Sequence, residues 1–439
     1  LLLKNISLDG SAKKICADKF NNNHYFPIRI YKNNLAANKD FGGKMPIAWG
    51  SHENYLIDAS YIAGAGVIYE KFESVLLPFL ITRQIYGGAG WLELDNKNSQ
   101  LRFCLAQRPL VTTSVLSGAA TSNRAIISTK NEPLADGSRW RRLHLTMGDS
   151  NMSPIALWLK IKITSLLLDL FEDKNFLLPY DFSGLKDPVF HFREISGDLS
   201  FSHSFFWGGK THTALSTQKF YLELIRKFFL EEQRKEADEE TINAIELWGQ
   251  ALSAVENRKF EELAPWFDNF AKLFIMQKTL SRTGRTFEDR KYKTVYFKKG
   301  KAESDLLHYL KSIDFSYHRV NMNQGAYFVF QKSNACENLK TNLSEKLPFL
   351  IKDLATKENI ERAWWLPPAG RAKWRFEATK FVEKARDTLG LRLARVDWTY
   401  FRADFSDEAD LYFVNQNPYA EMTADLEFYI SRFERTGKV

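Results

Sequence analysis

The chain has 439 residues, of which 44% are hydrophobic and 26% charged, which is the composition of a globular protein with room for a large core. No apolar stretch reaches the roughly 18 uninterrupted residues of a membrane span, because residues 155–171 are broken by Lys160, Lys162 and Asp169. The net charge of +8 permits an acidic protein or a nucleic acid as partner. The basic residues are spread along the chain rather than gathered in one arm, which argues against nucleic acid.

The first half alternates runs that are typical of β-strands with loops rich in Asn, Gly and Asp. The pattern predicts strands in five runs: residues 26–33, 77–85, 100–108, 124–130 and 142–148. Three isolated cysteines, Cys16, Cys104 and Cys336, form neither a zinc spacing nor a disulfide framework, which predicts a reducing cytoplasm.

Two segments, residues 50–57 and 139–151, place polar side chains in strand-like alternation. In the second, Leu143 and Leu145 share one face, while Arg142 and His144 share the other. In the first, Glu53 falls on the face opposite to His52 and Asn54. A carboxylate and an imidazole on two strands can ligate a divalent cation, and an Arg can bind the phosphate that it carries. An ion-paired sheet surface explains the same pattern.

The middle of the chain is predicted to be helical. Residues 154–171 are apolar nearly all round, with Ser153 as N-cap and Pro154 at the first helical position. Residues 220–235 and 239–255 have one apolar face.

A boundary is expected near residues 364–370, where two prolines and a glycine form a stiff turn. Beyond it we expect a helix closed by Gly390, a strand over 392–404, another over 410–414, and a final helix from about Tyr419. This predicts two domains, residues 1–365 and 366–439.

Several motifs resemble the Pup ligase family, whose sister is the deamidase and depupylase of Pup within the glutamine synthetase-like carboxylate–amine ligases. These are GSHENYLI, LLPFLITRQIYGGAG, RWRRLHLTMGDSN, REISGDLS, PPAGRAKWR, VDW and NPY, in matching order from about Tyr31 towards the C-terminus. The resemblance implies an α+β fold: a glutamine synthetase-like antiparallel sheet backed by helices, with a small C-terminal α/β domain.

The resemblance also implies an activity. With ATP and Mg²⁺, such a ligase phosphorylates the C-terminal glutamate side chain of Pup, an acidic and disordered modifier. A lysine of a target protein then attacks the γ-glutamyl phosphate, and the isopeptide product is marked for proteasomal degradation. Neither nucleic acid nor a membrane is expected as partner.

Residue by residue, the resemblance makes Glu53 and His144 metal ligands, and Arg142 and Trp398 nucleotide-binding residues. The family's general-base Asp lies in a segment without counterpart here, so no catalytic residue is assigned, and we expect an N-terminally truncated, inactive chain. One departure is residues 130–134, Lys-Asn-Glu-Pro-Leu, where the family has Arg-Asp-Glu-Pro-His. Depupylase or deamidase activity, a small-molecule glutamate–amine ligase and a non-catalytic modifier-binding homologue remain alternatives.

Overall fold

The computed structural model describes most of the chain between residues 30 and 438. The described residues are 30–35, 48–59, 65–95, 100–119, 123–130, 134–173, 185–282, 294–296, 301–344, 358, 362, 366–406 and 410–438. Residues 26–29 of the predicted strand over 26–33 lie outside them, as do Cys16, residues 131–133 of the departing loop and the start of the predicted domain boundary.

The largest sheet among the described residues has four strands in the order β1-β6-β5-β4. Its strands are β1 (Glu53–Asp58), β6 (Trp140–Leu145), β5 (Ala125–Ser128) and β4 (Ser114–Ser117). β6 runs antiparallel to both β1 and β5, as the resemblance implied, whereas β4 and β5 are parallel. Asn54 pairs with His144 and Glu53 with Leu145 across β1 and β6.

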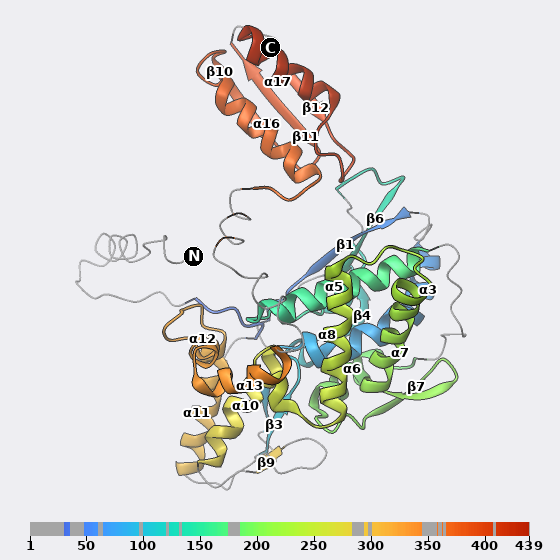
Figure 1. Cartoon of the computed structure of the whole chain (residues 1–439), viewed down its shortest axis with the longest axis vertical. Coiled ribbons are helices and arrows are strands. Elements are labelled where there is room, and N and C mark those ends of the chain that lie inside the picture. Colours follow the sequence, from blue (N-terminus) through green and yellow to red (C-terminus); the bar gives the residue numbers. More distant parts are fainter. Residues whose placement is uncertain are drawn as a thin grey trace, which may run out of the picture.

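Helices cover one side of this sheet and enclose the main core (Figure 1). The long ones are α3 (Ala65–Thr82), α5 (Pro154–Glu172), α7 (Ala214–Arg226) and α8 (Glu239–Glu256). The predicted start of α5 is confirmed, because Ser153 Oγ accepts a hydrogen bond from the Ala156 N–H and Pro154 occupies the first turn.

The strand predicted over residues 77–85 is wrong. These residues close α3 and open α4 (Gln84–Gly87), where the side chains from Leu76 to Gly87 are all buried. A continuous apolar run has no periodicity that separates a buried strand from a buried helix.

The remaining described elements of the larger unit surround this core. They are β2 (Trp91–Asp95), β3 (Gln100–Cys104), η2 (Arg108–Leu110), α6 (Pro188–Gly197), β7 (Ser204–Trp207), β8 (Lys210–Thr213), the π-helical η3 (Lys227–Glu231), α9 (Phe260–Leu263), α10 (Asp268–Ser281), β9 (Thr294–Tyr296), α11 (Lys301–Tyr317), α12 (Ala326–Gln331) and α13 (Asn334–Ser344).

A smaller C-terminal unit has a hydrophobic core of its own, centred on Trp374, Phe381, Phe401 and Phe413. Its elements are α16 (Arg371–Ala385), β10 (Leu391–Val396), β11 (Tyr400–Phe405), β12 (Leu411–Val414) and α17 (Ala424–Thr436). The single strand predicted over 392–404 is instead the hairpin β10–β11. The final helix begins at Ala424 rather than near Tyr419.

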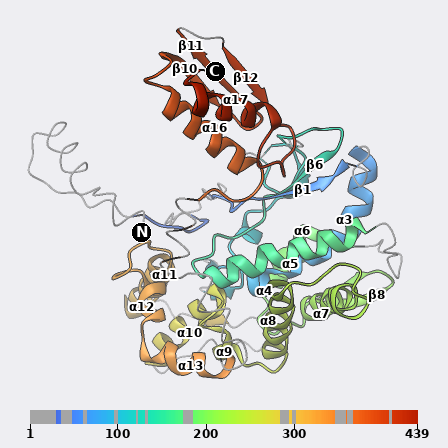
Figure 2. The same cartoon turned by 45° about the horizontal axis from the view of Figure 1, so that its top comes forward.

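The C-terminal unit lies beyond the end of the main sheet where β6 begins, as both views show (Figures 1 and 2). The Trp140 and Tyr419 rings meet edge to face at 5.2 Å, and the Asp136 N–H donates to the Gln416 carbonyl at 3.2 Å. The same β6 strand carries Arg142 and His144, so the junction adjoins one end of the candidate site. Among the described residues, no helix has the length and apolarity to cross a membrane.

Candidate functional site

Four side chains form a connected polar patch on the sheet, on the face opposite to the main core. We call His52, Asn54, Arg142 and His144 the histidine–arginine face. Arg142 Nε donates to Asn54 Oδ1 at 2.8 Å, and Arg142 Nη2 lies 3.2 Å from His144 Nδ1. His144 Nε2 lies 3.0 Å from His52 Nδ1. The alternation predicted for these two strands is therefore confirmed, and it brings Arg142 and His144 together.

Arg142 determines the direction of the hydrogen bonds along this face. A guanidinium can only donate, so Nδ1 of a neutral His144 accepts and its Nε2 carries the proton. That N–H then donates to His52 Nδ1, which leaves the His52 proton on Nε2. The face therefore presents donors, which suit an oxyanion such as a phosphate or a carboxylate.

Both imidazoles are held neutral. Burial, followed by the charges of Arg142, His52 and Lys130, lowers the pKa of His144 from its ordinary 6.5 to about 4. Burial and the charges of Arg108 and Arg142 also lower the pKa of His52. Burial and the positive charge around the face thus both disfavour protonation, and the positive charge would favour a bound anion.

Glu53, the predicted second metal ligand, lies on the opposite face from His144. It pairs across the strands with Leu145 and is only 7% exposed. Arg83 donates from Nη1 and Nη2 to its two carboxylate oxygens at 2.9 and 2.7 Å. The charges of Arg83 and Lys160 hold the pKa of Glu53 below its ordinary value although burial would raise it. The sheet separates Glu53 from His144, so the two side chains do not form one metal site in this structure, and the metal-ligand role of each stays a prediction.

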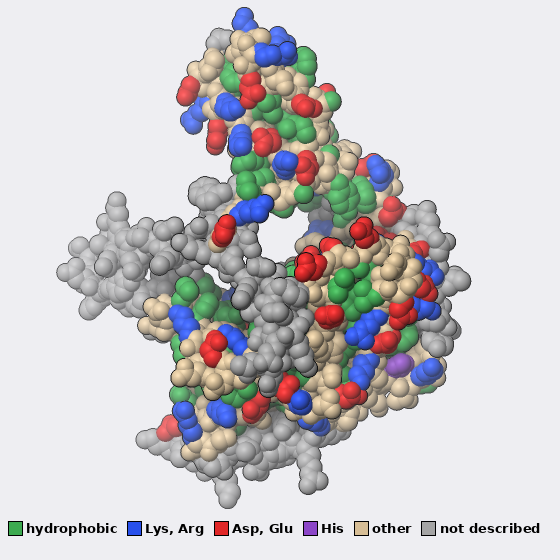
Figure 3. All heavy atoms as spheres, viewed as in Figure 1, with side chains coloured by type: hydrophobic (Ala, Val, Ile, Leu, Met, Phe, Trp, Pro, Cys, Tyr) green, Lys and Arg blue, Asp and Glu red, His purple; other side chains and the backbone are tan. Residues whose placement is uncertain are grey.

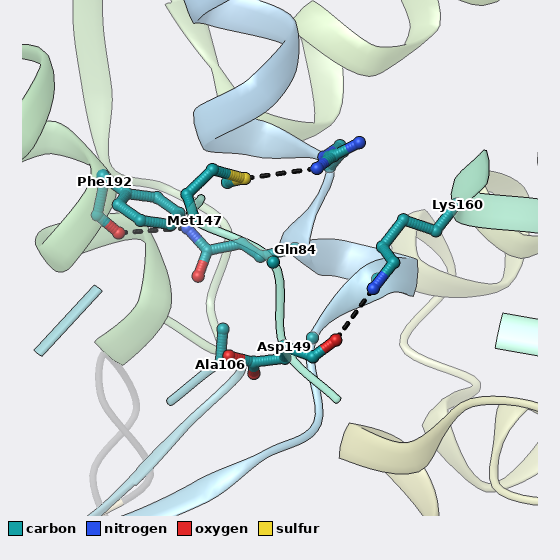
Figure 4. A pocket seen from close by; sticks show the side chains of 10 residues that line it. Gln84, Ala106, Met147, Asp149, Lys160 and Phe192 are labelled. Carbon is teal, nitrogen blue, oxygen red and sulfur yellow. Dashed lines mark hydrogen bonds between the residues drawn. The ribbon is translucent and has the colours of Figure 1, made fainter. Parts of the chain in front are cut away.

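The Glu53 side of the sheet is a buried polar layer beneath the candidate site. Lys160 Nζ donates to the Asp149 carbonyl at 2.8 Å and to Asn151 Oδ1 at 2.9 Å, next to a small cavity (Figure 4). Gln84, which lines the same cavity, donates to the Phe192 carbonyl. This layer joins α4, α5 and the segment after β6, so its chemistry is structural.

The described residues do not fit a magnesium ion on the histidine–arginine face. Mg²⁺ prefers octahedral oxygen ligands, usually carboxylates and water. No group of three or more His, Cys, Asp or Glu residues that could hold a metal occurs in the described part of the chain. Both nitrogens of His144 already face polar partners. No chemical step is therefore assigned to a metal here.

Arg108, at the start of η2, was not predicted. It is only 3% exposed, and its Nη2 donates to the Thr146 carbonyl at 3.0 Å. The His52 ring and the Thr146 carbonyl both lie against Gly50, where an added Cβ would stand 2.7 and 3.1 Å from them. A larger residue at position 50 would have to displace the His52 ring. In the sequence, Arg108 is only an Arg at the end of an apolar strand-like run. Such a position is too common to identify a functional residue.

Trp398 lies in the turn between β10 and β11 and is 51% exposed. The Arg375 guanidinium stands over its ring, 4.3 Å from the centroid. No described contact joins Trp398 to the histidine–arginine face, so its predicted role at a nucleotide stays a prediction. An exposed indole with a cation on one side retains a surface that can stack on a base.

The family model for Pup-ligase protein matches residues 7–402. The chain belongs to the Pup-ligase family. It is 30% identical over 407 residues to Pup–protein ligase 1 of Rhodococcus erythropolis, covering 92% of this chain and 76% of that relative. It is 29% identical over 394 residues to the Pup–protein ligase of Mycolicibacterium smegmatis, covering 89% of this chain and 74% of that relative. The family assignment made from the motifs is thereby confirmed.

Solved structures of the ligase PafA have the same fold. One, of the complex between Pup and PafA, gives a TM-score of 0.73 at 24% identity, covering 99% of this chain and 76% of that one. Another, of PafA with ADP, gives a TM-score of 0.72 at 24% identity, covering 99% of this chain and 82% of that one. The predicted α+β fold, a sheet backed by helices with a small C-terminal unit, is confirmed.

Proposed function

We propose that this Pup-ligase family member joins the C-terminal glutamate side chain of a Pup-like modifier to lysines of target proteins, with ATP as the energy source. A carboxylate oxygen of the glutamate attacks the γ-phosphorus of ATP, and ADP leaves. The lysine nitrogen then attacks the carbonyl carbon of the γ-glutamyl phosphate, and inorganic phosphate leaves with the formation of an isopeptide bond. Such a bond would mark the target for proteasomal degradation.

The observation that carries this proposal is the donor-rich histidine–arginine face within a Pup-ligase fold. Four species in the proposed sequence are oxyanions: the γ-phosphate, the carboxylate, the acyl phosphate and the released phosphate. Arg142 is oriented by Asn54 and keeps its charge at any physiological pH, so it can hold these oxygens throughout. Preorganised donors of this kind stabilise developing charge without reorganisation at the moment of reaction.

The lysine amine must lose a proton before it attacks, because its ordinary pKa of about 10.4 leaves it protonated at neutral pH. The two imidazoles of the face do not suit this role, since the hydrogen-bond chain leaves His52 with its proton on Nε2 and His144 with both nitrogens engaged. We assign no general base among the described residues. Mg²⁺ stays a prediction from the family resemblance, with its carboxylate ligands unassigned.

The partner we propose is an acidic, disordered modifier, as Pup is for its relatives. The net charge of +8 favours encounter with such a segment, and this attraction weakens as salt screens it. Basic and acidic side chains are interspersed over the face of the molecule in Figure 3, without one continuous basic area. This distribution supports a protein partner over a nucleic acid. A cytoplasmic location stays a prediction; Cys104 and Cys336 are free and buried.

The test is a conjugation assay with Pup ending in glutamate, ATP, magnesium and a lysine-bearing acceptor, read by gel shift and by mass spectrometry of the isopeptide. An ATP-dependent conjugate linked through the glutamate side chain would support the proposal, and it would contradict the inactivity that the motifs lead us to expect. Saturable Pup binding without conjugation would support a modifier-binding homologue instead. Cleavage of a preformed conjugate without its synthesis would support a depupylase. A DNA duplex that binds at physiological salt where Pup does not would contradict the partner assignment.

A further inference from the structure

Arg108 is a buried cation whose positive charge is poorly compensated by its described neighbours. Its side chain is almost entirely enclosed, its Nε has no hydrogen-bond partner among the described residues, and its Nη2 bonds to a neutral carbonyl. No carboxylate forms an ion pair with it in the described part of the chain. Taking a charge out of water without a counter-ion is strongly unfavourable, and a guanidinium cannot escape by losing its proton.

The carboxylate that attracts Arg108 most, Asp149, is already engaged elsewhere. One of its oxygens accepts from the backbone N–H groups of Ala89 and Gln107, and the other from the backbone N–H of Arg108 itself. Asp149 therefore holds the loop that carries Arg108, while the guanidinium extends to Thr146 beside the histidine–arginine face. The positive charge of nearby Arg124 repels that of Arg108.

We infer that Arg108 forms a previously unassigned oxyanion subsite beneath His52, which takes a phosphate group or a carboxylate. The guanidinium and the imidazole converge there: Thr146, which accepts from Arg108, and the ring of His52 both lie against Gly50. The unpaired Arg108 Nε and the proton on His52 Nε2 are two donors that such a group could accept from.

The inferred subsite deepens the proposed function, on which the identity of the oxyanion rests. A phosphate there would be the group that ATP transfers and the ligation releases, whereas a carboxylate would be that of the modifier's glutamate. Replacing a buried structural arginine and replacing an anion-binding arginine also have different effects on the stability of the ligand-free protein. Removing an uncompensated buried charge costs little or even stabilises, whereas removing a satisfied one leaves its partners unpaired.

The experiment compares the wild type with Arg108→Met and Arg108→Lys in phosphate-free buffer. Arg141→Met is the matched control, because that guanidinium bonds to the carbonyls of Gly137 and Trp140 and not to the histidine–arginine face. Thermal unfolding is measured without anion and with graded inorganic phosphate at constant ionic strength. Calorimetric titrations with ADP, phosphate and a peptide ending in glutamate distinguish the two sources of the oxyanion.

We expect Arg108→Met to unfold without anion at the wild-type temperature or above it, and to bind phosphate or the glutamate peptide at least tenfold more weakly. Weakening of phosphate alone assigns the phosphoryl group, and of the peptide alone the carboxylate. Arg108→Lys keeps the charge but not the planar fork, so it should fold and still lose affinity; this variant decides the outcome if Arg108→Met does not fold. Arg141→Met should bind as the wild type does.

Wild-type affinity for both anions in Arg108→Lys, or in a folded Arg108→Met, would overturn the inference. A marked fall in unfolding temperature without anion, with anion binding intact, would make Arg108 a structural residue. The conjugation assay separates the two claims. Conjugation with unchanged anion affinity in the variants refutes the subsite alone, whereas anion binding that depends on Arg108 without any conjugation refutes the proposed ligation alone.

Discussion

The Glu53→Gln variant should unfold far more easily than the wild type. The reason is the loss of a buried ion pair and not the loss of a metal ligand. In the native state Glu53 accepts two hydrogen bonds from Arg83 and one from Tyr55 Oη at 2.8 Å, and Lys160 Nζ lies 3.9 Å away. Arg83 is itself fully enclosed, with 1% of its surface exposed. The substitution therefore leaves a buried guanidinium without its carboxylate.

Breaking one partner of a buried ion pair typically costs about 3–5 kcal/mol, and we expect Glu53→Gln to lie in that range. The assay is urea unfolding followed by circular dichroism and tryptophan fluorescence. The control is Glu256→Gln, which breaks the exposed 2.6 Å pair with Lys219 and should cost no more than about 1 kcal/mol. The double variant Glu53→Met with Arg83→Met should recover part of the loss, since it removes both buried charges.

An unchanged midpoint in Glu53→Gln, together with loss of magnesium-dependent nucleotide turnover, would refute this reasoning. It would return Glu53 to the metal-ligand role that the family resemblance implies. Unfolding at lower urea with the same slope would support the buried-pair account.

Three further predictions concern the face itself. The pKa of His144 is lower in the folded than in the unfolded state, so its contribution to stability is fully present above pH 6.5 and is lost as pH falls towards 4. Urea midpoints measured from pH 7.5 to 4.5 should therefore fall less steeply in His144→Gln than in the wild type. Parallel curves for the two proteins would contradict this prediction. Gly50→Ala places a methyl 2.7 Å from the His52 ring and should weaken phosphate binding, whereas Gly137→Ala, whose nearest atom would be 3.9 Å away, should not; equal affinities measured by calorimetry would count against the close packing. Trp398→Ala should raise the ATP dissociation constant roughly tenfold, because stacking of a base on an aromatic ring is worth about 1–3 kcal/mol, and an unchanged constant would limit the indole to another role.

The sequence predicted the local geometry of the site well and its assembly poorly. Alternation in β1 and β6 was sufficient to place Arg142 beside His144, because side chains two residues apart share a face of a strand. It also assigned Glu53 to the face opposite His52. The joint metal site required Glu53 and His144 to share a face, which depends on strand register, and register is a tertiary property.

The partners of Glu53 and the role of Arg108 depend on contacts between distant segments. Arg83 lies 30 residues after Glu53 in a segment that the pattern predicted as a strand. The contact between the two side chains could therefore not be predicted from the sequence. Arg108 is placed by Asp149, 41 residues later, through backbone hydrogen bonds. Single-sequence patterns do not contain such pairings. The motifs that carried the family resemblance nevertheless predicted the fold, because they span both units of the chain.

The rate of ATP-dependent Pup conjugation by Arg142→Ala, normalised to the folded fraction and compared with Arg141→Ala, tests the central claim most directly. The two arginines are neighbours on β6 and belong to opposite faces of the sheet. If the histidine–arginine face holds the reacting oxyanions, Arg142→Ala should lose at least tenfold in rate while Arg141→Ala conjugates Pup nearly as the wild type does. Equal rates in the two variants would contradict the assignment of ligation to this face.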